Sequence, residues 1–168
     1  TVKGNHDVGV FSSKESDTWN PHAQEKIKVH RKLLIQSNKD WLGELPLYIV
    51  DDDLRFVHAM PPDSYSRYVF EVYKDRIFAG MLMKETPERI SFVGHTHQLG
   101  LYKWNGSEMA KFSFVDDTMY LDSDSKYVVN VGSAGKPRGQ ENLTYIIYDS
   151  DRNCVTAKWV EMPEDYIC

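Results

Sequence analysis

Two short motifs constrain this chain more than any other feature of its sequence. Gly4-Asn5-His6-Asp7 stands almost at its start, and Gly94-His95-Thr96-His97 stands far downstream. Amide oxygens and imidazole nitrogens are ligands that zinc, manganese and iron accept. A His-x-His pair on an extended segment would direct both rings to one side, and the glycine before it allows a close approach of the backbone. The two motifs therefore predict a site for two adjacent metal ions.

The histidines share a position relative to apolar runs of the chain. Of the six histidines, three lie in the two motifs, which follow the apolar runs 1–3 and 90–93, and His58 ends another such run. Sheet proteins of this kind place ligands at the carboxyl ends of their strands. A single histidine is more often a core or surface residue, and we interpret His22 and His30 in that way because no motif surrounds them. The clustered histidines predict a site.

Taken in order, these pieces resemble the calcineurin-like metallophosphoesterase family. The matches are Gly-Asn-His-Asp at 4–7, His58 within Phe-Val-His-Ala, and Gly-His-Thr-His at 94–97. A weaker match is the segment 130–138, which resembles the Asn-Pro-Gly-Ser-Val-Gly-x-Pro-Arg loop of the compact prokaryotic branch, although Val131 replaces a proline. The resemblance extends from residue 1 to about residue 160 in the order typical of the family.

The resemblance implies two divalent metal ions, whether manganese, iron, zinc, nickel or magnesium. Asn5, His58 and His95 match ligands of one ion, and His97 matches a ligand of the second. The implied reaction is hydrolysis of a phosphomonoester or phosphodiester, in which a hydroxide bridging the two ions attacks phosphorus.

The resemblance also implies roles for residues that touch the substrate. His6 matches the acid that protonates the leaving oxygen, and Asp7 matches the carboxylate that orients the imidazole ring. Ser133 and Arg138 would contact the substrate phosphate. A tight loop between strands is the alternative interpretation of the glycine-rich stretch 132–139, which lacks the Lys-Ser/Thr ending of a nucleotide-binding loop.

Two motifs of the family, Asp-x-His and Gly-Asp-x-x-Asp, do not occur in this sequence. They supply the remaining ligands, including the carboxylate that bridges the ions, and they normally precede the motif at 4–7. We therefore expect an amino-terminally truncated member whose intact form is a phosphoesterase. This chain alone would bind metal weakly and support little hydrolysis. The alternative is a non-catalytic metal-binding or scaffold module on the same fold.

Composition narrows the partners and the compartment. A formal net charge of −5 argues against nucleic acid, and no run of about eighteen apolar residues indicates a membrane span. Cys154 and Cys168 are too few for a disulfide framework, which favours free thiols in the cytoplasm. We expect a small phosphorylated substrate as the partner, and homo-oligomer formation is left open.

The pattern along the chain predicts an α/β (α+β) fold in a single domain, 1–168. With the resemblance, it implies two packed β-sheets flanked by helices, a four-layer sandwich lacking its first strands. The segment 65–84 is consistent with either strand or helix, and the three acids 51–53 are interpreted as a hairpin turn. The remaining expected elements are helices at 21–36 and 37–42 and strands at 47–50, 54–58, 99–104, 109–115, 127–131, 143–148 and 155–160.

Overall fold

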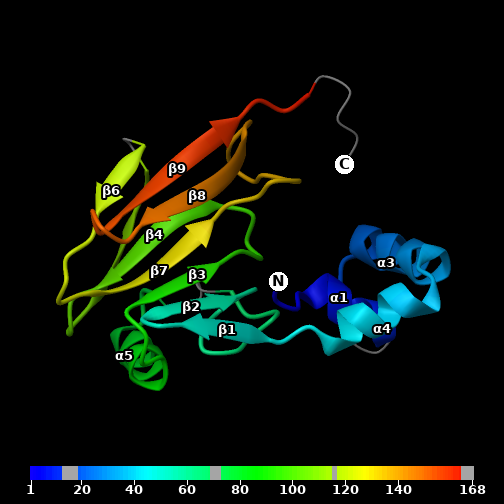
Figure 1. Cartoon of the computed structure of the whole chain (residues 1–168), viewed down its shortest axis with the longest axis horizontal. Helices are drawn as coiled ribbons and strands as arrows, with labels where there is room; N and C mark the ends of the chain where they lie inside the picture. The colour runs from blue at the N-terminus through cyan, green and yellow to red at the C-terminus, as the bar shows by residue number, and fades with distance from the viewer. Residues whose placement is uncertain (13–18, 69–72, 115–116, 164–168) are drawn as a thin grey trace.

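The computed structural model describes residues 1–12, 19–68, 73–114 and 117–163. Helices α1, α3 and α4 gather beside the ends of the strands, away from α5 (Figure 1). The helices are α1 (Asn5–Phe11), α3 (Pro21–Leu33), α4 (Gln36–Glu44) and α5 (Arg76–Glu85). None of the described helices is both long enough and apolar enough to cross a membrane.

The strands form a six-stranded mixed sheet and a three-stranded antiparallel sheet. In the larger sheet the order is β1-β2-β3-β7-β4-β5, and the neighbours β2, β3 and β7 run parallel to one another. The smaller sheet has the order β6-β9-β8. Because the three parallel strands are adjacent, their carboxyl ends meet at one edge of the sheet. The strands are β1 (Tyr48–Asp51), β2 (Leu54–Val57), β3 (Ile90–Val93), β4 (Leu99–Trp104), β5 (Met109–Phe112), β6 (Thr118–Tyr120), β7 (Lys126–Val131), β8 (Leu143–Asp149) and β9 (Cys154–Val160).

The central strands β3 and β7 of the larger sheet are buried on both faces. Successive side chains of a strand point in opposite directions, so neighbouring residues enter different apolar clusters. Phe92 and Val129 pack in one apolar cluster with Val155 of the smaller sheet. Their neighbours Val93 and Val128 pack in a second cluster that contains the buried side of α5. Strands buried on both faces read as continuous apolar runs, which is the pattern of β3 and β7.

Two sheets flanked by helices are confirmed as the fold class. The described residues form three layers, which are α5, the larger sheet and the smaller sheet. Tyr145 and Ile147 on the outer face of the smaller sheet are about half exposed, and none of the helices described covers that face.

Most of the expected elements are present where local signals predicted them. The helix predicted from Asn20-Pro21 is α3, whose first turn is capped because Ala23 N donates to the Asn20 side chain at 3.0 Å. The acids 51–53 do form the turn of the β1–β2 hairpin, with Asp52 at a φ of 51°. The expected second helix is α4, and the expected tail strands are β4, β5, β7, β8 and β9.

At three places the structure differs from the secondary structure expected from the sequence or adds to it. The apolar run 1–3 is not a strand, and its backbone is held instead by Lys3 N donating to Pro46 O at 2.8 Å. The segment 65–84, for which strand and helix were both considered, contains α5 with Asp75 as its N-cap. Residues 69–72 of this segment lie outside the described residues. The short strand β6 was missed because three residues carry too little periodicity to be recognised.

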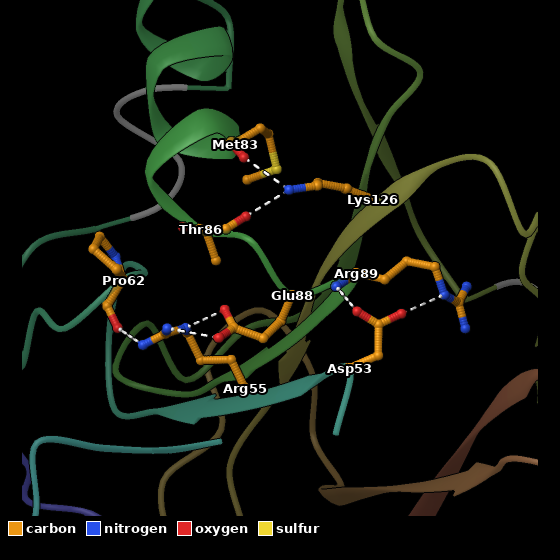
Figure 2. A network of polar contacts seen from close by, with 8 residues as sticks. All are labelled: Asp53, Arg55, Pro62, Met83, Thr86, Glu88, Arg89 and Lys126. Atoms are coloured by element: carbon orange, nitrogen blue, oxygen red, sulfur yellow. Dashed lines mark hydrogen bonds and ion pairs between the residues drawn. The ribbon is translucent and has the colours of Figure 1, made fainter. Parts of the chain in front are cut away.

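A buried ion pair fixes the strand that leads to His58 (Figure 2). Arg55 of β2 donates to both carboxylate oxygens of Glu88, at 2.7 and 2.9 Å, and the two side chains are 7% and 9% exposed. The same guanidinium donates to Pro62 O at 2.8 Å, just beyond the histidine. Bidentate pairs of this kind define one geometry, so the chain on both sides of His58 is held to the sheet.

Candidate metal centre

The candidate site lies at the edge where the parallel strands end. His58 follows β2, the segment 94–97 follows β3, and the loop 132–139 follows β7. The amino-terminal turn of α1 brings Asn5 and His6 to the same edge. A cavity of about 610 Å³ opens there. Its walls are Gly4, Asn5, His6, Asp7, Trp19, Asn20, His22, Ala23, Lys26, His58, Ser66, Tyr68, His95, His97, Lys136 and Arg138.

Three of the expected metal ligands converge on one point. The amide oxygen Oδ1 of Asn5 lies 3.0 Å from His58 Nε2 and 3.3 Å from His95 Nδ1. Two ligand atoms bound at right angles to one ion, with bonds of about 2.1 Å, lie about 3.0 Å apart. Gly4 permits this approach, since a Cβ there would come within 2.9 Å of the His58 ring. The spacing therefore fits one shared ion.

The segment that carries His95 and His97 is a tight turn, so the expected extended conformation was wrong. Both histidines have left-handed backbones, with φ of 60° and 62°. The buried Asn130 of β7 holds the turn, because its side-chain amide donates to Thr96 Oγ1 at 2.7 Å and to Gly94 O at 3.1 Å. Non-glycine residues persist in this region only when surrounding contacts compensate for the strain.

His97 has a defined tautomer. Its Nδ1 lies 2.6 Å from the carbonyl oxygen of Lys136, and a carbonyl can only accept, so Nδ1 carries the proton. Nε2 is left with its lone pair available. Metal-binding histidines commonly donate their other ring N–H to a backbone carbonyl in this way. No hydrogen bond among the described residues joins His97 to the Asn5 cluster, which agrees with a ligand of a second ion.

The clustered imidazoles are kept neutral. Burial, together with the nearby His95, lowers the pKa of His58 to about 4. Burial also lowers the pKa of His95, although the Ser66 backbone acts in the opposite direction. The Nε2 atom of His95 is buried and has no hydrogen-bond partner in the described structure. Neutral imidazole is the form that binds metal, so the environment suits this function.

His6 lies in the cavity wall, but its ring contacts a residue that the sequence did not indicate. The ring centroid is 4.9 Å from that of Trp19, at an interplanar angle of 39°. Asp7 was expected to orient this ring, whereas its carboxylate instead accepts a hydrogen bond from Gly4 N at 2.7 Å and caps α1. No hydrogen bond joins His6 and Asp7 in the part of the chain described. The effect of Asp7 on His6 is therefore electrostatic: its charge raises the His6 pKa, which burial and nearby His30 lower.

With this geometry established, the comparison with known families is decisive. Residues 1–153 match the calcineurin-like phosphoesterase superfamily domain. The chain belongs to this superfamily.

The relatives of this chain are longer than the chain itself. It is 33% identical over 158 residues to an uncharacterized protein of Methanocaldococcus jannaschii, covering 89% of this chain and 59% of that protein. It also resembles the crystal structure of a metallophosphoesterase from Sphaerobacter thermophilus, with a TM-score of 0.74 and 28% identity. That match covers 96% of this chain and 66% of the other. The chain thus spans about three fifths to two thirds of these relatives.

The donors present fit a metal ion as part of its coordination shell. They are two imidazoles and one amide around the Asn5 cluster, with a third imidazole at His97. Nowhere in the described ranges do three or more histidine, cysteine or carboxylate side chains gather as a metal site. A donor set rich in imidazole suits an ion such as zinc or iron, and the remaining ligands are not among these groups.

Of the two residues expected to contact phosphate, Arg138 lines the cavity and Ser133 does not. The backbone N of Arg138 donates to His97 O at 2.9 Å. The hydroxyl of Ser133 instead accepts hydrogen bonds from Gly135 N at 3.2 Å and Lys136 N at 2.8 Å, so it closes the loop. The tight-loop interpretation of this stretch therefore describes Ser133 better.

Sequence reasoning missed four residues of the site. Tyr68 places its ring 4.4 Å from that of His95, Trp19 packs on His6, and Lys26 lines the cavity from α3. Asn130 holds the turn between the two histidines. Only Asn130 carried a signal, because it begins the loop motif at 130–138.

Proposed function

We propose that the whole protein is a metal-dependent phosphoesterase that hydrolyses a small phosphomonoester or phosphodiester. The convergence of Asn5 Oδ1 with His58 Nε2 and His95 Nδ1, within 3.0 and 3.3 Å, carries this proposal. Membership of the calcineurin-like phosphoesterase superfamily supports it. The proposal covers the activity, the use of metal ions and the class of substrate.

In this proposal Asn5, His58 and His95 hold one divalent ion and His97 binds a second. Bound ions would supply positive charge to the phosphoryl oxygens and make water a better nucleophile. The residues of this chain prepare the site beforehand. The Lys136 carbonyl sets the tautomer of His97, and burial keeps the imidazoles neutral, as lowered pKa values of His58 and His95 indicate.

His6 would donate a proton to the departing oxygen, and Arg138 would orient the phosphoryl group. An acid must hold its proton at the working pH. Burial lowers the pKa of His6 overall, and the charge of Asp7 acts in the opposite direction and so favours the protonated ring. Packing against Trp19 restricts the orientations available to the His6 ring, so the ring is already positioned for proton transfer when the substrate binds.

The size and charge of the cavity support a small phosphorylated molecule as the substrate. A volume of about 610 Å³ is in the range of small-molecule sites. The chain has only two cysteines, which is typical of proteins in a reducing compartment. We therefore propose that the protein is cytoplasmic.

The second candidate is a non-catalytic metal-binding or scaffold module. One observation favours it: in the part of the chain that the structure describes, Asp7 is the only carboxylate of the cavity wall, and it is engaged as a helix cap. A site without a carboxylate ligand would leave the charge of two divalent ions poorly balanced.

Manganese-dependent hydrolysis by the full-length protein separates the two candidates. The substrates are para-nitrophenyl phosphate and bis(para-nitrophenyl) phosphate, assayed with manganese and after treatment with a chelator. We expect metal-dependent turnover that is lost in His95→Ala and kept in His30→Ala, since His30 is an exposed residue of α3. Metal binding without turnover would support the scaffold module, and turnover that survives His95→Ala would refute the proposed ligand role.

A further inference from the structure

The cavity collects positive charge in a chain that is negative overall. The formal net charge of the chain is −5, yet among the described residues Lys26, Lys136 and Arg138 line the cavity against a single acid, Asp7. That carboxylate already accepts a hydrogen bond from Gly4 N. None of the three cations forms an ion pair with another described residue. A recess lined by unpaired charge of one sign concentrates ligands of the opposite sign.

These cations stand on two separate elements of the cavity wall. Lys136 and Arg138 belong to the loop after β7, whose backbone is hydrogen-bonded to His97. Lys26 belongs to α3 and lines the cavity, and Trp19, which lies just before that helix, packs on the ring of His6. Lys136 and Arg138 therefore lie on the side of the metal-donor residue His97, and Lys26 lies on the side of His6.

A phosphoryl group at the metal donors would be met by the loop cations, which leaves Lys26 without a role in holding it. In the proposed function His6 protonates the leaving oxygen, so the leaving group extends along the same wall. Trp19 and the first two turns of α3 form that wall. The indole offers apolar surface and Lys26 offers charge. This combination fits a leaving group that has a planar or apolar body and an anionic end.

We infer that the cavity takes a phosphoester whose leaving group carries its own negative charge, a carboxylate or a second phosphate, and that Lys26 binds this charge. The inference rests on the proposed function and names the substrate class for the same site. Lys26 is thereby a specificity-determining residue. It selects among esters through the leaving group and leaves the handling of the phosphoryl group unchanged.

The test compares 4-carboxyphenyl phosphate with its neutral carboxamide analogue. With manganese-loaded full-length protein, we expect Lys26→Gln to lower kcat/KM for the carboxylate ester by roughly tenfold, the equivalent of one partly buried charge contact. The amide ester should change by less than about twofold. The matched control is Lys28→Gln. Lys28 lies on the same helix, but its side chain is 60% exposed and pairs with Glu25 at 3.8 Å.

Binding of the same two esters to chelator-treated protein, measured by calorimetry, separates this inference from the proposed function. If Lys26→Gln weakens binding of the carboxylate ester alone while neither ester is hydrolysed with metal, the inference stands and the proposed function fails. If both esters are hydrolysed and Lys26→Gln affects them equally, or the wild type shows no preference for the carboxylate, the inference is overturned and the proposed function stands. An equal effect of Lys28→Gln would also overturn it, because the preference would then reflect overall charge.

Discussion

The indole of Trp19 packs against the imidazole of His6, with ring centroids 4.9 Å apart. Gly9 of α1 makes room for this contact, because a Cβ there would come within 2.6 Å of Trp19 Cη2. The Arg31 side chain donates to the carbonyls of Gly9 and Ser12, each at 2.8 Å, and so joins α1 to α3. The position of the proposed acid thus depends on how two helices pack.

Replacing Trp19 should therefore act on the proton-transfer step. We expect Trp19→Leu to slow esters with poor leaving groups by roughly tenfold while esters with good leaving groups change little, since only poor leaving groups need protonation. His6→Ala should show the same selectivity with a larger effect, roughly 10² to 10⁴-fold. Rates across a series of aryl phosphates measure this. Trp41→Leu, at an exposed position of α4, is the control, and equal slowing across the series would contradict a role in positioning the acid.

Gly4→Ala should weaken metal binding without removing any ligand. The new Cβ would lie 2.9 Å from the His58 ring, so the ring or the start of α1 must shift away from the shared point. We expect roughly a tenfold or greater loss of affinity, as for changes in groups that orient ligands. Metal content after dialysis and titration calorimetry both report this. Gly80→Ala is the control, because Gly80 lies in α5 without a left-handed φ and a Cβ there would meet the Trp104 ring at 3.5 Å, an ordinary contact. Unchanged affinity in Gly4→Ala would count against the shared ion.

The Arg55–Glu88 pair should be costly to break from one side. Arg55→Met leaves Glu88 buried and unpaired, and we expect a loss of about 3–5 kcal/mol in the free energy of unfolding. The double variant Arg55→Met/Glu88→Leu should lose less than Arg55→Met alone, because no buried charge remains. Urea denaturation of the full-length protein measures both. Lys28→Gln, which breaks an exposed pair, should cost less than about 0.5 kcal/mol, and a comparably small loss in Arg55→Met would show that the buried pair contributes little.

Without metal, stability should fall as the pH drops from about 6.5 towards 4. Burial lowers the pKa of His58 to about 4, so in this range the unfolded chain binds a proton that the folded chain does not. Each such group costs up to about 1.4 kcal/mol per pH unit, and the contribution vanishes above the unfolded pKa. The lowered pKa values of His6, His95 and His97 act in the same direction.

Urea denaturation of chelator-treated protein at pH 7.5, 6.0 and 5.0 measures this dependence. His58→Gln should make it shallower, because that group no longer titrates. A stability that stays level between pH 7.5 and 5.0, or one that rises, would contradict the buried neutral state of these imidazoles.

Local signals in the sequence determined much of this protein. Asn20-Pro21 specified the start of α3, and Asn105-Gly106 specified the β4–β5 turn, because capping and turn chemistry act over a few residues. The motifs at 4–7 and 94–97 indicated an amide oxygen and imidazole nitrogens as metal ligands. The resemblance they carry was sufficient to predict the family and the class of fold, both of which are confirmed.

Only the tertiary structure decided how those residues meet. Asn5 is 53 residues from His58 and 90 from His95, yet its Oδ1 lies within 3.3 Å of a ring nitrogen of each. Parallel pairing of β2 and β3 brings the two histidines to one edge of the sheet, and the first turn of α1 brings Asn5 there. The same holds for Trp19 on His6. Asp7 followed its nearest backbone donor, Gly4 N, in preference to the neighbouring ring. Such contacts depend on packing between distant segments, which leaves no periodic trace in the sequence. The motifs therefore identified the donors of this site, and the fold determined their spacing, their protonation and the presence of Lys26, Lys136 and Arg138 in the same cavity wall.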